Sequence, residues 1–431
     1  MLKRPLVAAM IFQCVSLFVG VANVPLLLHY LSSDEFVAWI VIATLGALTI
    51  QLEQGLLVIA TRRVAWQWHG EDVEATQREL ARVRSTFHRF SASVLVCLGG
   101  VGLFYFSLWA NMALPPHWEL AWALFVSAYA INYWFGHNNV VLLAMEATHT
   151  FNMVNSCTRL LNLALGFLFL SLGLSILGLA LSFFLSVVVS VLMHARNARR
   201  QLAVARGKHD TSDRPAHSHR PEWQGLGFSL YTLSNFLVYR GAFLLLPLLP
   251  HNFQLDSYGL ALQLVAIVYA VSVIPAQVWL GQLVTAVSSR SLHRVASHLG
   301  KSLAFAAGVF LLLFGLALGV AGPALSLLGS DVSLPPAADL ALVFSAFFIE
   351  SLIFLLVNVL LLLGRQRYLY GYSAGVLFIV SLCCAYALFL DPDVGVRVFL
   401  ILPMLFQGLV ALPGAVVVLT FALARLGTRG S

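Results

Sequence analysis

Long apolar segments follow one another along almost the whole chain, and this feature limits the possible folds most strongly. Each segment has about 20 residues, the length that a helix needs to cross the hydrocarbon core of a bilayer. Of the 431 residues, 60% are hydrophobic and only 10% are charged, which excludes a soluble globular protein of this length. Lipid offers no partner for backbone polar groups, so spanning segments must be helices or closed barrels. The sequence therefore predicts an all-α polytopic membrane protein.

About twelve transmembrane helices are expected, in two lobes of six. They run approximately over residues 7–31, 36–60, 87–109, 119–145, 151–171, 174–195, 225–248, 256–282, 299–322, 338–363, 369–390 and 397–423. We expect an N-terminal six-helix lobe over 1–195, a cytoplasmic basic linker over 196–222 and a C-terminal six-helix lobe over 223–431. The linker contains histidines, but no cluster of cysteines or carboxylates has ligand spacing, so a solvated connector is expected and not a metal site.

The basic residues predict the orientation in the membrane. With the N-terminus in the cytoplasm, all but three of the 25 Lys and Arg residues fall on the inner side, the exceptions being Arg159, Arg240 and Arg397. The outer loops carry mostly acidic residues. This distribution follows the positive-inside rule. We therefore expect both termini in the cytoplasm, and the net charge of +7 indicates basic loops and no nucleic-acid partner.

The two halves begin in a similar way. Pro25–His29 is followed by Asp34, and Pro247–His251 is followed by Asp256, at a constant offset of 222 residues. Two halves that enter the membrane from the same side are parallel repeats, an arrangement known in transporters. The prolines predict bends in both first spans, which suit either an opening cavity or simple packing irregularity.

Polar residues at helical spacing interrupt three of the spans. Asn155, Arg159 and Asn162 share one face of the fifth span, and Asn132 and Asn23 belong to similar stripes on the fourth and first spans. Such stripes line polar cavities, or they hydrogen-bond to neighbouring helices. Both interpretations stay open for the first and fourth spans. For the fifth span the sequence favours a cavity, because an arginine in hydrocarbon is costly, with snorkelling to the inner surface as the main competitor.

Four charged residues fall inside predicted spans, namely Arg159, Arg240, Glu53 and Glu350. They predict either two structural ion pairs, or arginines that bind an anionic substrate together with a carboxylate that carries protons or sodium. No catalytic constellation, nucleotide-binding loop or metal-ligand pattern is present in the sequence, so no enzyme, cofactor or ATP hydrolysis is expected. A membrane-embedded glycan polymerase or acyltransferase would need a large outer loop or a buried catalytic histidine, and the sequence offers neither.

The chain resembles the multidrug/oligosaccharidyl-lipid/polysaccharide (MOP) flippase superfamily, and within it the polysaccharide transporter branch of O-antigen-type flippases. Residues Pro25–Leu27, Leu31–Trp39 and Gln51–Leu56 are similar to family segments around the second span, and the number of spans, the two halves and the basic middle loop agree with the family. Family members usually carry the acidic residue next to the glycine, whereas here Gln54 separates Glu53 from it.

The resemblance implies a protein of the bacterial inner membrane that moves an undecaprenyl-pyrophosphate-linked oligosaccharide between leaflets by alternating access. The residues themselves suggest that Arg159 and Arg240 hold the pyrophosphate. Sugar hydroxyls would contact the asparagines Asn155, Asn162, Asn132 and Asn23. Glu53 and Glu350 are candidates for coupling to H⁺ or Na⁺, and membrane lipids are the other expected partners. The alternative is a cation-coupled, MATE-like exporter of drugs or small solutes, with a smaller and more acidic cavity.

Overall fold

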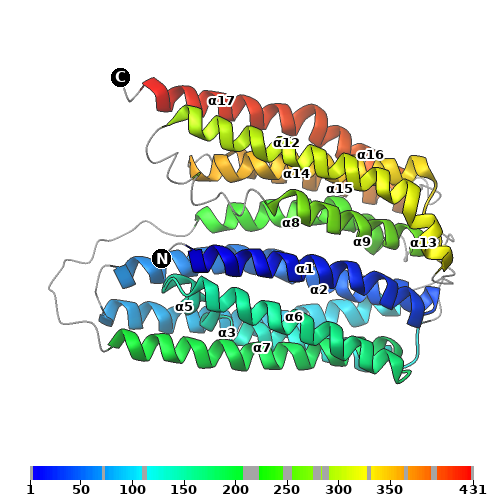
Figure 1. The fold of residues 1–431 in the computed structure, drawn as a ribbon, viewed down its shortest axis with the longest axis horizontal. Coiled ribbons are helices and arrows are strands. Elements are labelled where there is room, and N and C mark those ends of the chain that lie inside the picture. Colours follow the sequence, from blue (N-terminus) through cyan, green and yellow to red (C-terminus); the bar gives the residue numbers. More distant parts are fainter. Residues whose placement is uncertain are drawn as a thin grey trace. The chain divides into compact units, whose positions relative to one another are not determined.

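The computed structural model describes residues 3–69, 73–108, 114–206, 223–245, 255–274, 283, 291–327, 332–363, 367–389 and 396–428. Every regular element in these residues is a helix (Figure 1), which confirms the all-α prediction. Ten of the described helices are long and apolar enough to cross a membrane. A multi-pass membrane protein follows from this length and composition.

Contacts between Cα atoms divide the chain into two compact units. The first consists of Met1–Val19, Ala38–Leu108 and Leu114–Ser229. Within it α6 packs along α7, α7 along α4, and α4 along α3. The helices of the N-terminal half are α1 (Lys3–Tyr30), α2 (Ser33–His69), α3 (Val73–Ser107), α4 (Trp118–Trp134), α5 (His137–Ala144), α6 (Thr148–Ser171) and α7 (Ser175–Arg206).

The second unit consists of Gly20–Val37, Trp109–Ala113 and Leu230–Ser431. Its central helix is α14, which contacts α9, α12, α16 and α17. Burial of Ile353, Val357 and Leu360 on α14 agrees with this position. The helices are α8 (Trp223–Leu245), α9 (Leu255–Ser272), α12 (Leu292–Leu316), α13 (Gly322–Leu327), α14 (Ala337–Leu362), α15 (Arg367–Phe389), α16 (Val396–Phe406) and α17 (Leu412–Thr428).

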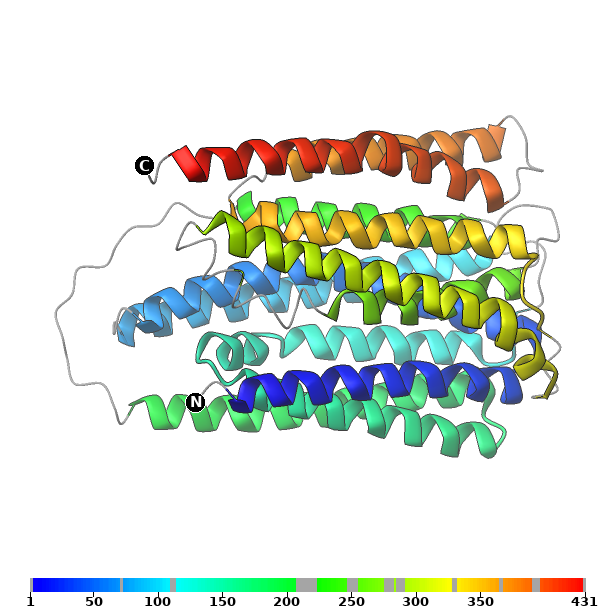
Figure 2. The ribbon, with the colours of Figure 1, turned by 45° about the horizontal axis from the view of Figure 1, so that its top comes forward.

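Two π-helical turns interrupt the helices of the second unit. The turn η2 (Ala317–Ala321) lies between α12 and α13, and η3 (Gln407–Ala411) lies between α16 and α17. The α16–η3–α17 stretch forms the red end of the ribbon in Figure 2. A π turn inserts one extra residue into the helical register, and such turns are frequent at functional sites. The spans predicted over 299–322 and 397–423 correspond to the single apolar spans His293–Val320 and Arg397–Ala424.

The span expected over 119–145 is wrong as a single helix. The structure divides it at Phe135 and Gly136 into α4 and α5. Gly136 lies directly against Phe87, because a Cβ atom built on it would be 2.5 Å from Cδ1 of that ring. Close packing of α3 on the bend therefore accompanies the break, which residue hydropathy alone does not reveal.

Several helices also extend beyond the predicted spans. The third span was expected to begin at residue 87, yet α3 begins at Val73 and continues through charged residues. The helix α7 continues to Arg206, so residues 196–206 of the expected linker are helical. Ala, Arg and Gln favour helices in water as well as in lipid, which explains these extensions. The remainder of the expected linker, 207–222, lies outside the described residues.

The start of each sequence repeat is only partly described. In the first half, Pro25 lies inside α1, His29 lies in its last turn, and Asp34 lies in the first turn of α2. In the second half, Asp256 lies in the first turn of α9, whereas Pro247 and His251 fall outside the described residues. Asp34 and Asp256 thus occupy equivalent positions, where a carboxylate stabilises the helix N-terminus.

Candidate functional site

A buried polar pair joins α2 to α4 in the first unit. The hydroxyls of Thr49 and Tyr133 are 2.7 Å apart, and both residues are buried. Glu53 follows Thr49 by one helical turn, is half-buried, and lies near enough for its charge to act on Tyr133. The predicted coupling carboxylate therefore adjoins a hydrogen-bonded pair that could pass a proton.

The asparagines of the fifth predicted span turn toward α7. Oδ1 of Asn155 is 3.2 Å from Nε2 of His194, and Oδ1 of Asn162 accepts a hydrogen bond of 3.1 Å from Ser182. These contacts join α6 to α7, which is the helix-pairing role considered for the polar stripes. Both asparagines are half-buried, so part of each side chain remains accessible.

Arg159 lies on α6 between those two asparagines but has a different environment. Its side chain is exposed, and its guanidinium carbon is 4.8 Å from the centre of the Phe12 ring on α1. A cation over an aromatic face is stabilised by the ring quadrupole. Part of the Arg159 side chain is not covered by the protein.

A buried carboxylate cluster lies in the second unit. Glu350 on α14 is only 7% exposed, and its carboxyl group is hydrogen-bonded to the hydroxyl of Tyr269 on α9. The positive charge of Arg240 on α8 acts on the same carboxyl group. Arg240 also lies over Phe236, with its guanidinium carbon 5.5 Å from the ring centre. Arg240 and Glu350 therefore belong to one electrostatic cluster, in which the charge of the arginine acts on the carboxyl group.

A chain of hydrogen bonds runs beside this cluster. The amide of Gln407 donates to the hydroxyl of Tyr372 over 2.6 Å, and that hydroxyl donates to Oδ1 of Asn235. All three residues are buried, and Gln407 is the first residue of η3. The chain ties α8 and α15 to the π turn. Sequence reasoning missed these residues, although a lone glutamine inside an apolar span was a usable signal.

The remaining predicted site residues lie outside the clusters described above. Asn132 on α4 and Asn23 on α1 are both half-buried. Of the four charged residues predicted inside spans, the structure brings Arg240 and Glu350 together and gives Glu53 and Arg159 separate surroundings. Among the described residues, no group of three or more His, Cys, Asp or Glu side chains is arranged to hold a metal ion.

Comparison with known proteins gives a clear result for the fold. No protein-family model matches the sequence, and no curated protein matches it. A solved inward-facing multidrug resistance MATE family transporter of the MOP superfamily superimposes with a TM-score of 0.62 at 11% identity, covering 97% of this chain and 98% of that chain. The MATE multidrug transporter DinF-BH also gives 0.62, at 16% identity over 97% of this chain and 96% of that chain.

A MOP superfamily transporter from Pyrococcus furiosus, described as having a binding pocket of reverse polarity, gives a TM-score of 0.57 at 15% identity over 99% and 96% of the two chains. All three matches span nearly the whole molecule. The chain therefore has the fold of MOP superfamily transporters, as the sequence resemblance predicted. The similarity extends over both halves and does not single out the polysaccharide branch.

Proposed function

We propose that this protein is a membrane transporter, not an enzyme, that works by alternating access. The fold supports this proposal, because the solved structures that match it include both an inward-facing and an outward-facing MATE family transporter. Two conformations of one fold are what alternating access requires. The chain's polar and charged clusters lie in helices that are otherwise apolar, as expected for a transport path.

The proposed substrate is an undecaprenyl-pyrophosphate-linked oligosaccharide, moved from the inner to the outer leaflet of a bacterial inner membrane. The observation that carries this proposal is the exposed guanidinium of Arg159 on a membrane helix, held over the Phe12 ring. Guanidinium groups bind phosphate oxygens in a bidentate manner. Arg240 supplies a second guanidinium, and sugar hydroxyls would contact Asn155, Asn162, Asn132 and Asn23.

Glu53 and Glu350 are the proposed ion-coupling residues. The carboxyl group of Glu350 is hydrogen-bonded to the hydroxyl of Tyr269, and the charge of Glu53 acts on Tyr133. A carboxyl group inside a membrane protein can hold a proton or a sodium ion and release it when its surroundings change. When a proton or a sodium ion neutralises Glu350, Arg240 would become available to bind an anion. Ion binding at Glu350 would in this way be coupled to substrate binding.

A cation-coupled exporter of drugs or small solutes is the second candidate. The match to the multidrug transporter DinF-BH and the buried Glu350–Tyr269 contact favour it. It differs from the flippase in one respect that can be measured. An exporter of cationic drugs depends mainly on the carboxylates, whereas a flippase of a pyrophosphate depends on the arginines.

The experiment is glycan display in cells that lack their own flippase and carry this gene with the matching glycosyltransferases. We expect Arg159→Ala and Arg240→Ala to reduce display at least tenfold each, because an unneutralised pyrophosphate cannot enter the path. Arg397→Ala is the matched control, since Arg397 pairs with Asp339 through a 2.6 Å contact at an exposed helix end. Undiminished display in the first two variants, with drug resistance lost in Glu350→Gln, favours the exporter.

A further inference from the structure

The adjoining ends of α2 and α3 enclose a small pocket outside the clusters described above. Its floor is apolar and includes the buried residues Ala60, Val83 and Phe87. Arg63 from α2, together with Glu79 and Arg82 from α3, lines its polar side. A pocket with an apolar floor and two guanidinium groups suits a ligand that is both oily and anionic.

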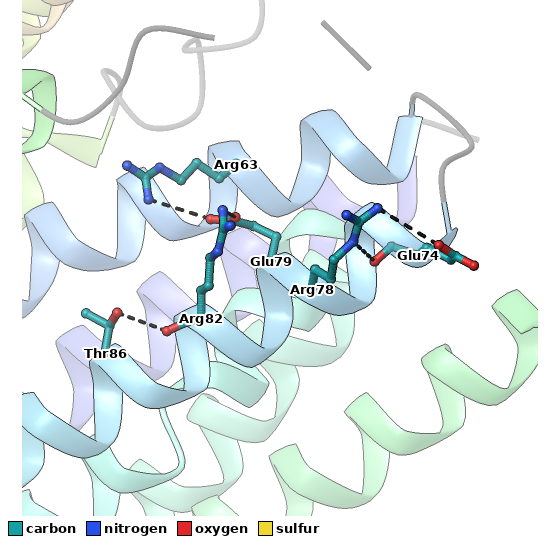
Figure 3. Close-up of polar contacts among 6 residues, drawn as sticks. All are labelled: Arg63, Glu74, Arg78, Glu79, Arg82 and Thr86. Carbon is teal, nitrogen blue, oxygen red and sulfur yellow. Dashed lines mark hydrogen bonds and ion pairs between the residues drawn. The ribbon is translucent and has the colours of Figure 1, made fainter. Parts of the chain in front are cut away.

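The two arginines converge on one carboxylate. Nη1 of Arg63 is 3.6 Å from one oxygen of Glu79, and Nη1 of Arg82 is 3.4 Å from the other (Figure 3). These distances exceed the roughly 2.7–2.9 Å of a strong charge-assisted hydrogen bond. The guanidinium of Arg82 has five N–H donors and its side chain is 77% exposed, so it retains donor capacity beside Glu79. The three side chains carry one net positive charge.

The pocket lies where the apolar part of each helix ends. The helix α2 has 37 residues and is about 55 Å long, well beyond the roughly 30 Å of a hydrocarbon core. Val58 is 53% exposed and apolar, whereas Arg62 and Arg63 follow within about one turn. Trp66 is 48% exposed one turn later, as is typical of aromatic residues at the membrane–water boundary. The pocket is therefore at the depth of lipid headgroups.

We propose that this pocket binds the phosphate headgroup of an anionic phospholipid, with Arg63 and Arg82 as the anion-binding residues. The acyl chains of that lipid lie along the exposed apolar surface that includes Val58. Basic pockets at the cytoplasmic ends of membrane helices bind anionic headgroups for this reason. The apolar floor and the headgroup depth favour a membrane lipid over a soluble phosphate.

Glu79 has a defined part in this proposal. Its side chain is 11% exposed and lies between the two arginines, where it competes with the phosphate for their donors. The carboxylate keeps the arginines oriented when no lipid is bound. Replacing it with an uncharged amide of the same shape should therefore strengthen lipid binding.

The test is native mass spectrometry of the full-length protein in a neutral detergent, titrated with phosphatidylglycerol or with phosphatidylcholine. We expect Arg63→Gln and Arg82→Gln each to weaken phosphatidylglycerol binding about fivefold, and Glu79→Gln to strengthen it. Arg78→Gln is the matched control on the same helix as Arg82, because Arg78 is 71% exposed, does not line the pocket, and points toward Glu74 in Figure 3. Phosphatidylcholine should bind equally weakly to all variants.

Three results would overturn the proposal. One is equal loss of phosphatidylglycerol binding in Arg78→Gln and Arg63→Gln, which indicates diffuse surface charge. Another is displacement of the lipid by millimolar inorganic phosphate, which indicates a soluble-anion site. The third is weaker binding in Glu79→Gln in a protein whose melting temperature is unchanged.

Discussion

Gly102 on α3 lies against the indole of Trp122 on α4. A Cβ atom built on Gly102 would overlap Cζ2 of that ring, and Trp122 is only 2% exposed. The indole also donates a hydrogen bond of 3.3 Å to the carbonyl of Gly99, which limits its movement. The close approach of α3 and α4 therefore requires the absence of a side chain at this position.

Gly102→Ala should lower the stability of the first unit by about 1–3 kcal/mol, the usual cost of overpacking a core. Gly100→Ala is the control two residues away, because a Cβ atom there meets nothing within 4 Å. It should be neutral or slightly stabilising, since alanine favours a helix over glycine. The measurement is thermal melting in detergent, and equal melting temperatures for the two variants contradict the packing described here.

Tyr372 occupies the middle of the buried hydrogen-bond chain in the second unit. Tyr372→Phe leaves Gln407 and Asn235, both buried, without this partner and should cost about 1–3 kcal/mol. Tyr386→Phe on the same helix is the control, because Tyr386 is 41% exposed. If the melting temperatures of the two variants differ by less than a degree, the hydrogen bonds of Tyr372 contribute nothing to the stability of the protein.

At the residue scale, the sequence predicts which residues are functional candidates better than it predicts where their side chains point. Glu350 and Arg240 were recognisable because charge is rare inside apolar spans. Their common cluster with Tyr269 was not recognisable, because three separate helices form it. Similarly, the spacing of Asn155 and Asn162 predicted a shared face, yet only the packing of α6 on α7 gives their partners.

At the element scale, hydropathy located the helices but not their ends. The helix α3 continues from apolar Val96 back to charged Arg78, and both lie in one 35-residue helix. Apolar length therefore underestimates a helix that leaves the membrane. The division between α4 and α5 was hidden for the opposite reason, since Phe135 and Gly136 interrupt no apolar pattern. The π turn at Gln407 has no hydropathy pattern of its own.

The extension of α3 makes a prediction about accessibility. In a background without the five native cysteines, Arg78→Cys should react with a membrane-impermeant maleimide in inverted vesicles and not in intact cells. Val96→Cys should react in neither, because Val96 is 72% exposed on an apolar part of the helix and so faces lipid, where thiolates form poorly. Labelling of Arg78→Cys in intact cells would place this residue outside and would contradict the orientation that the positive-inside rule predicts.

At the scale of the whole molecule, the predicted topology was a stronger basis for the fold prediction than any sequence motif. The number of spans and the weak similarity around Leu31–Trp39 were enough to predict the MOP fold, which solved structures match over nearly the entire chain. The substrate is a different matter, because transporters of one fold differ in the few side chains that line their path. The proposed flippase assignment depends on charge, and specifically on Arg159 and Arg240.

Transfer of a lipid-linked oligosaccharide across a defined bilayer tests this assignment most directly. The purified protein is reconstituted in proteoliposomes with a fluorescent pyrophosphate-linked oligosaccharide, and a glycosidase in the outer solution reports the accessible fraction. We predict that the wild-type protein and Arg397→Ala exchange the lipid between leaflets, and that Arg159→Ala and Arg240→Ala are slower by tenfold or more. Equal rates for all four proteins, or no transfer by any of them, would contradict the account.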